Sequence, residues 1–184
     1  MKNLMRMRTS LSEEVQDILN AQIEMEGNAS QKYLAMATWA DRNGYKNSAG
    51  YFYSQSDEER DHMLKIVRFV VDNGGTVTTP EVKQPKQEYT SIRECFETAL
   101  ESEIAVTKSI NRIVAVSREA VDYATEQLAF WFVKEQIEEE YIARRAIEVI
   151  DLMEGESLYT IDVELGNIRS QAPAPFDAVG GEAV

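Results

Sequence analysis

The chain has 184 residues, which is enough for one domain with a sizeable core, and its 32 acidic and 19 basic side chains give a formal net charge of −13. This balance argues against nucleic acid as a partner and favours cations, although an acidic surface can also serve solubility alone. A single cysteine, Cys95, excludes an intrachain disulfide, and no apolar run reaches the length of a membrane span or forms a secretory signal, so we expect a cytoplasmic protein without a membrane partner.

Long amphipathic stretches follow one another along the chain, and helix-starting or helix-stopping residues separate them. Ser10 or Ser12 can cap the first stretch, and Gly44 can end it. Ser91, followed three residues later by Glu94, forms a capping-box pattern at the start of the third. The predicted helices span residues 11–42, 46–73, 91–117, 120–154 and, as a short fifth helix, 157–168.

Connection lengths predict how these helices are arranged. The first two helices, and likewise the third and fourth, are joined by only a few residues, so each pair forms an antiparallel hairpin. Residues 74–90 between the hairpins reach about 55 Å when extended, whereas the second helix is only about 40 Å long. The connection can therefore cross the whole length of the molecule. The sequence predicts an all-α four-helix bundle of two antiparallel hairpins joined by a long crossover, plus a short fifth helix.

Both ends of the chain fall outside this bundle. Residues 1–10 are expected to form an N-terminal extension, and residues 11–170 the helical domain. Residues 171–184 contain two prolines and two glycines and are expected to be a disordered tail.

Polar side chains interrupt the apolar stripe of every long helix. The glutamates among them fall within about one turn of the middle of their helices. In a bundle with aligned ends they should therefore meet at one height. The interrupting residues are Glu26, Tyr33, Glu59, His62, Glu103, Gln136 and Glu139.

A core that gathers four carboxylates and one imidazole needs positive charge. A buried carboxylate costs several kcal/mol unless it is paired, and basic residues are scarce on these stripes. Metal cations are the simplest source of that charge. For one position alone, a partly exposed glutamate or a hydrogen-bonded core histidine is the more common explanation, but independent coincidences would not cluster at one height.

Glu59 and His62 are the strongest pair, because their spacing puts both on one helix face, where they can bind the same metal. Carboxylates with one imidazole suit iron or manganese rather than a structural zinc site, although zinc can compete. Di-iron bundles combine a Glu from each of two helices with a Glu-x-x-His from each of the other two. This chain has three of these four elements, and Gln136-Ile137-Glu138-Glu139 replaces the second Glu-x-x-His.

Four segments carry a family resemblance: Leu19–Glu26, Asp57–Met63, Trp131–Glu140 and Leu158–Leu165. With them, about residues 19–168 resemble the non-haem bacterial and archaeal ferritins, which implies the ferritin-like version of the bundle. The only histidine, His62, cannot supply the two-histidine site of bacterioferritin or rubrerythrin. Arg60 stands where bacterioferritin has its haem-binding methionine, so no haem is expected.

The resemblance implies a di-iron centre inside one subunit. It implies that Glu26, Glu59 and His62 hold the first iron and that Glu59 bridges to a second. It also implies that Glu103 and Glu139 hold this second iron, with Gln136 close by.

A third iron position is implied by Glu58, Glu135 and Glu138, which would share Glu139. A solvated acidic face would explain Glu58, Glu135 and Glu138 equally well. Tyr33 matches the tyrosine beside the site in this family. It could supply an electron during oxygen reduction or only hydrogen-bond a ligand.

The implied function is iron storage. The resemblance implies a ferroxidase that oxidises Fe(II) to Fe(III) with O2 or H2O2, and a hollow homo-oligomeric shell, a 24-mer, that holds the ferric mineral. A di-iron peroxidase would need a second histidine, and a miniferritin-like DNA-protecting protein would lack the fifth helix and place its ligands between subunits. A metal-free helical interaction module would need neutral or solvated carboxylates in the core.

Overall fold

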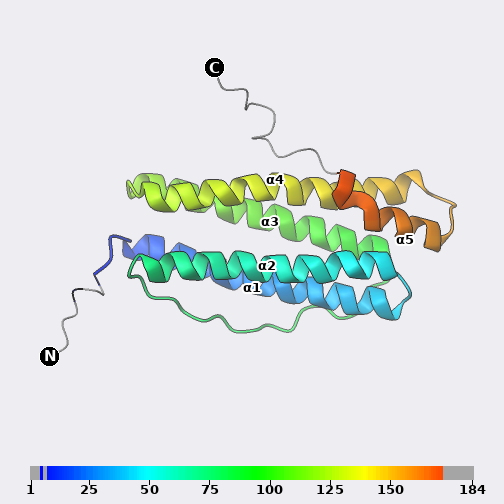
Figure 1. The fold of residues 1–184 in the computed structure, drawn as a ribbon, viewed down its shortest axis with the longest axis horizontal. Coiled ribbons are helices and arrows are strands. Elements are labelled where there is room, and N and C mark those ends of the chain that lie inside the picture. The colour runs from blue at the N-terminus through cyan, green and yellow to red at the C-terminus, as the bar shows by residue number, and fades with distance from the viewer. Residues whose placement is uncertain (1–4, 6–7, 172–184) are drawn as a thin grey trace, which may run out of the picture.

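The computed structural model describes residue 5 and residues 8–171. Within this part the chain forms α1 (Glu13–Arg42), α2 (Lys46–Asp72), α3 (Ile92–Glu119), α4 (Tyr123–Leu152), α5 (Leu158–Asn167) and a 3-10 turn, η2 (Ile168–Gln171). α1 pairs with α2 and α3 with α4, and the connection between the pairs runs along the bundle, so that α2 and α3 are parallel (Figure 1). The predicted fold is therefore confirmed, including the crossover and the fifth helix.

Side-chain caps fix the starts of two helices. The hydroxyl of Ser12 accepts a hydrogen bond from the backbone N–H of Val15 at 3.2 Å, and that of Ser91 accepts one from Glu94 at 3.2 Å. The carboxylate of Glu94 accepts from the backbone N–H of Thr90 at 2.6 Å. The return bond of the expected capping box is therefore made to the residue before the cap rather than to the cap itself.

The turn between α3 and α4 differs from the sequence-based prediction, which ended one helix at residue 117 and began the next at residue 120. α3 continues to Glu119, and α4 begins only at Tyr123. No glycine marks this turn; instead Val121 adopts a left-handed backbone conformation with φ 56°. Asp122 then caps α4 by accepting from the backbone N–H of Thr125 at 3.0 Å. The position of this turn could not be predicted from helix-ending glycines, because a valine makes it.

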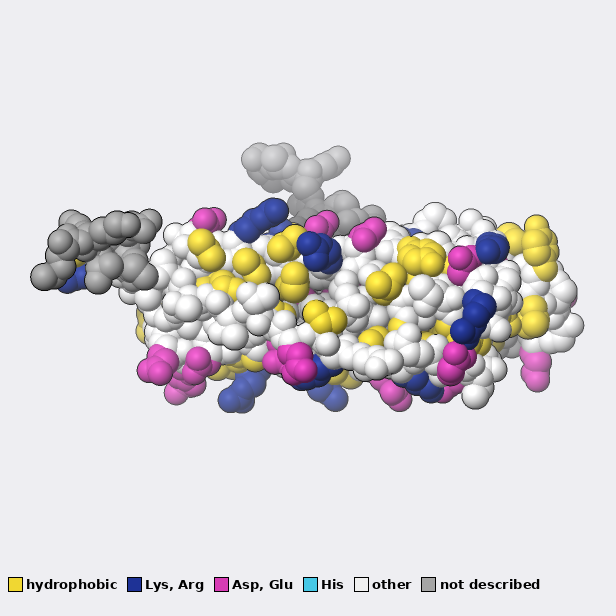
Figure 2. Space-filling view, turned by 90° about the horizontal axis from the view of Figure 1, so that it is seen from below, with side chains coloured by type: hydrophobic (Ala, Val, Ile, Leu, Met, Phe, Trp, Pro, Cys, Tyr) yellow, Lys and Arg dark blue, Asp and Glu magenta, His cyan; other side chains and the backbone are white. Residues whose placement is uncertain are grey.

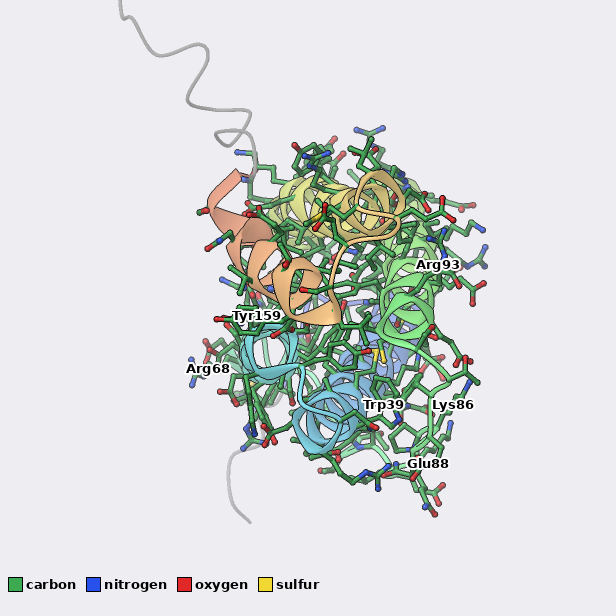
Figure 3. The ribbon with its side chains drawn as sticks, turned by 90° about the vertical axis from the view of Figure 1, so that its right-hand side faces the viewer. Trp39, Arg68, Lys86, Glu88, Arg93 and Tyr159 are labelled. Carbon is green, nitrogen blue, oxygen red and sulfur yellow. The ribbon has the colours of Figure 1, made fainter. Side chains whose placement is uncertain are left out.

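α5 packs alongside the bundle near one end, between α2 and α4 (Figure 3). The N-cap residue of α2, Tyr45, makes no side-chain capping bond. Asp162 of α5 takes that role, because its carboxylate accepts from the backbone N–H groups of Asn47 and Ser48, both at 2.9 Å, and from both of their side chains. Burial opposes ionisation of Asp162, but these hydrogen bonds outweigh it and hold its pKa below the usual value.

The apolar core is divided into two clusters, one toward each end of the bundle. One contains Phe52, Phe96 and Ile142, and the other contains Ile23 and Phe132. On every long helix, buried polar residues lie along the chain between members of the two clusters, so they form a polar waist. The waist residues are Glu26, Gln55, Glu59, His62, Glu103, Gln136 and Glu139.

The surface of the bundle mixes both signs of charge with separate apolar patches, as the face in Figure 2 shows. None of the helices described here has an apolar stretch long enough to cross a lipid bilayer. Of the predicted N-terminal extension, the structure describes residue 5 and residues 8–10. The predicted tail from residue 172 onward lies outside the described residues.

Candidate metal centre

The centre of the waist is a group of three buried side chains from two helices. Glu26 of α1 and Glu59 and His62 of α2 each offer a ligand atom, and these atoms all lie within 4.8 Å of one another. Nδ1 of His62 is 3.5 Å from Oε2 of Glu59. The imidazole is held edge-on against Trp131 and Phe132, with ring centroids 5.5 Å apart in both cases. The aromatic packing therefore restricts the ring beside the two carboxylates.

Glu103 of α3 is a further buried carboxylate of the waist, and two hydrogen bonds hold it. The hydroxyl of Tyr33 donates to its Oε1 at 2.5 Å, and the amide of Gln136 donates to its Oε2 at 3.0 Å. The same amide reaches the backbone carbonyl of Glu103 at 3.3 Å. Glu103 is not part of the three-residue group, but two predicted site residues, one from α1 and one from α4, fix its position.

Several carboxylate oxygens in the waist have no hydrogen-bond partner. Gln22 donates to Oε1 of Glu26 at 2.8 Å and accepts from Ser109 at 2.5 Å, which orients one side of that carboxylate. The opposite oxygen, Oε2 of Glu26, is buried and unpartnered, as are Oε2 of Glu59 and Oε2 of Glu139. Buried polar atoms normally have partners, so these oxygens fit ligands whose cation would complete them.

Electrostatics oppose ionisation of these carboxylates while no cation is bound. Burial, reinforced by the charge of Glu59, raises the pKa of Glu26 well above its usual value. Burial and the charge of Glu103 do the same for Glu59, and burial followed by the charge of Glu58 raises the pKa of Glu139 to about 9. Cation binding would therefore displace protons, as it does at metal sites generally.

A second, outer group lies beside the first and shares its histidine. Ligand atoms of Glu58, His62 and Glu135 all lie within 4.8 Å of one another, and the two glutamates are only partly buried. Burial raises the pKa of Glu135, and the charges of Glu58 and Glu138 add to that effect. Glu138 and Glu139 are therefore electrostatic neighbours of this group, although neither belongs to it. The outer group contains two of the residues expected at a third metal position.

One positive charge reaches this region from outside the four helices. Nη2 of Arg169, on η2, donates to Oε2 of Glu58 and lies 3.5 Å from Oε1 of Glu139. The expectation that metal must supply the positive charge, because the helical stripes lack basic residues, is therefore incomplete. An arginine beyond the last helix supplies part of it.

Sequence reasoning missed three residues of this region. Gln22 lies one turn before Glu26 on the same buried face, so helical periodicity could have found it. Tyr51 is buried with an unpartnered hydroxyl, and burial followed by the charge of Glu139 raises its pKa. Arg169 follows the fifth helix, where no periodic pattern applies.

Comparisons with known proteins identify the family of the chain. The family model described as ferritin-like domain matches residues 16–153. The bacterial non-heme ferritin of Campylobacter jejuni is 36% identical over 160 residues, which are 86% of this chain and 96% of that protein. That of Staphylococcus aureus is 34% identical over 158 residues, 85% of this chain and 95% of that protein.

A solved structure shows the same architecture. The open pore ferritin of the hyperthermophilic archaeon Archaeoglobus fulgidus superposes with a TM-score of 0.82 at 34% identity, covering 85% of this chain and 97% of that one. The family model covers most of the chain, and two relatives exceed 30% identity over more than four fifths of it. The chain belongs to the ferritin-like domain family.

Proposed function

We propose that this chain is the subunit of an iron-storage ferritin that oxidises Fe(II) at the waist of its bundle. Each Fe(II) gives up one electron to O2 or H2O2, and the Fe(III) produced is stored as mineral. Glu26, Glu59 and His62 bind one Fe(II) as substrate. Glu59 also faces the second position, whose other ligands are Glu103 and Glu139. Anionic ligands favour Fe(III) over Fe(II), because the extra positive charge gains more from them.

One observation carries this proposal: a buried imidazole lies beside buried carboxylate oxygens that accept no hydrogen bond. A purely structural polar core would satisfy those atoms, since an unmade bond costs about 1–3 kcal/mol for each group. Three such oxygens converge on the waist, from three different helices. Iron suits a donor set of carboxylates and one imidazole.

Two further features belong to the proposal. Glu58, Glu135 and Glu138, with Glu139, form a third iron position at the edge of the site, supported by the outer group of ligand atoms. The hydroxyl of Tyr33 is bonded to Glu103 and supplies an electron or orients that ligand. Gln136 orients Glu103 through its amide.

Storage requires a container, so we propose that the chains assemble into a closed homo-oligomeric shell of twenty-four subunits. At 20.9 kDa for each chain, such a shell has a mass of about 500 kDa, which sedimentation can measure. A reducing compartment, the cytoplasm, suits the single cysteine, because Cys95 is a free, fully buried thiol.

The test is aerobic oxidation of Fe(II) by the assembled, metal-free protein, followed by absorbance of Fe(III) and by the iron content of the high-mass fraction. Glu59→Gln keeps the shape of the side chain but removes the bridging carboxylate. We expect the initial rate to fall by at least about tenfold, because even the loss of a residue that only orients a metal ligand typically costs about 10–100-fold. The matched control is Glu101→Gln, on the exposed face of α3, which should oxidise iron as the unmodified chain does.

Binding and storage are scored separately from rate. Two to three Fe(II) should bind to each chain, and the oxidised iron should remain in the high-mass fraction. Oxidation no faster than in protein-free buffer would contradict the ferroxidase proposal. Oxidation without retained iron would contradict storage and favour a di-iron redox enzyme.

A further inference from the structure

Arg169 contacts one carboxylate of the outer acidic group and one carboxylate of the waist. Its guanidinium donates to Glu58 of α2 and lies 3.5 Å from Oε1 of Glu139 of α4, so it bridges two helices that face each other across the site. Glu58 also offers a ligand atom within 4.8 Å of His62 and Glu135. The arginine and a metal ion in the outer group would therefore compete for one carboxylate, that of Glu58.

The surroundings of Arg169 favour a cation at this point. The other oxygen of Glu139, Oε2, is buried without a partner. Tyr51 also has a buried hydroxyl without a hydrogen-bond partner, and its pKa is raised by burial and by the charge of Glu139 but lowered by that of Arg169. Burial lowers the pKa of Arg169, but the bond and charge of Glu58 and the charge of Glu139 outweigh it and raise that pKa, so the guanidinium keeps its proton. The guanidinium thus places one positive charge beside Glu58 and Glu139 while no metal is present.

Arg169 can leave this position without unfolding the bundle. Its side chain is about one third exposed (34%), so a rotation carries the guanidinium into solvent. The neighbouring Ile168 is fully buried in the apolar cluster at this end of the bundle and anchors the turn. The backbone of η2 can therefore stay in place while the side chain moves.

We propose that Arg169 is a built-in competitor for the third iron position: it holds Glu58 and Glu139 when iron is absent, and an incoming cation must displace it. This inference rests on the proposed function and adds a specificity-determining residue to it. The third iron is then held more weakly than the first two, because its binding includes breaking the Arg169 contacts. Weak binding suits a position through which iron passes.

The experiment is a calorimetric titration of the assembled, metal-free protein with Zn(II), a redox-silent probe of carboxylate and imidazole sites. In Arg169→Gln the weakest class of sites should bind Zn(II) about tenfold more tightly, a change that corresponds to about 1.4 kcal/mol. The tighter classes should be unchanged. Arg169→Lys keeps the charge and should fall between the two proteins. The control is Arg145→Gln, which removes an arginine of similar exposure (30%) from a surface ion pair with Glu148.

The direction of the change separates competition from a merely structural role. An arginine that only fastens η2 would leave the weakest class unchanged, or weaken it, when replaced, and either result would overturn the inference. If the tighter classes are missing in the unmodified chain as well, the proposed function fails and this inference fails with it. Sedimentation of each variant at the mass of the unmodified assembly verifies that the comparison is made on folded protein.

Discussion

Glu139→Gln should stabilise the metal-free protein, even though it removes a proposed ligand. Glu139 is 3% exposed, and burial, followed by the charge of Glu58, raises its pKa to about 9. A carboxyl group whose pKa is higher in the folded than in the unfolded chain opposes folding increasingly as pH rises from the unfolded value toward the folded one. Glutamine is neutral at every pH and avoids this effect.

The size of the effect follows from the two pKa values. Near pH 7 the folded protein keeps the proton on Glu139, while the unfolded chain, with a pKa near 4.5, has released it. The gap of about 2.5 pH units, at about 1.4 kcal/mol for each, gives about 3 kcal/mol. At about pH 5 the same reasoning leaves only about 1 kcal/mol. A chain of this length shifts its melting temperature by about 2–4 °C per kcal/mol, so the gain near pH 7 is about 6–12 °C.

The assay is thermal unfolding of metal-free protein at both pH values. Glu139→Gln should melt well above the unmodified chain near pH 7 and only slightly above it near pH 5. Glu101→Gln, the same substitution on the exposed face of α3, should change little at either pH. Added Zn(II) should reverse the order, because a bound cation stabilises the protein that retains all of its ligands more than the one that has lost Glu139.

Two results would refute this reasoning. A lower melting temperature for metal-free Glu139→Gln would mean that the carboxylate stabilises the fold by itself, for example through Arg169. A gain that is equally large at both pH values would mean that packing, rather than ionisation, separates the two proteins. Either outcome would remove the electrostatic argument for a cation at the waist.

Other expectations concern single contacts. Asp162→Ala should lower stability by about 2–3 kcal/mol, because the backbone N–H groups of Asn47 and Ser48 in α2 lose their cap. Folding lowers the pKa of Asp162, so this contribution is present above about pH 4 and fades in acid, which melting curves at several pH values would reveal. Val121→Gly should raise stability by up to about 1 kcal/mol by relieving a left-handed valine, and an unchanged or lower melting temperature would count against that strain. Tyr33→Phe should lower metal-free stability by about 1–2 kcal/mol, because Glu103 loses a buried donor, while Fe(II) titration should still show two irons for each chain.

The fold was predictable because several independent signals agreed. Gly44, Gly74 and Gly155 all have positive φ and stand at or just beyond helix ends, where the sequence pattern placed them. The crossover is long enough to run the length of the bundle, so its length allowed α2 and α3 to be parallel. The turn at Val121 was misplaced because its conformation is set by the packing of α3 on α4 and by the Asp122 cap, and no local sequence preference favours valine there.

The candidate site was predictable to the extent that helical periodicity reaches it. Glu26, Glu59 and His62 come together because helix spacing and aligned ends place them at one height. Arg169 was not predictable in this way, since its position depends on how α5 folds back onto α2 and α4. The partners of Glu103 were identified as site residues, but the direction of their hydrogen bonds required the three-dimensional structure.

The divided core explains why the waist can hold carboxylates that oppose folding. The two apolar clusters lie on either side of it, and each contains residues from all four long helices. Burying each large side chain of these clusters contributes about 1.5–3 kcal/mol to stability, so the clusters can offset the free-energy cost of burying several carboxyl groups. They also hold the helices in register, which prevents Glu26, Glu59 and Glu139 from moving apart into water. The cost of ionising these carboxyl groups therefore persists in the folded protein, and bound protons avoid it until a cation takes their place.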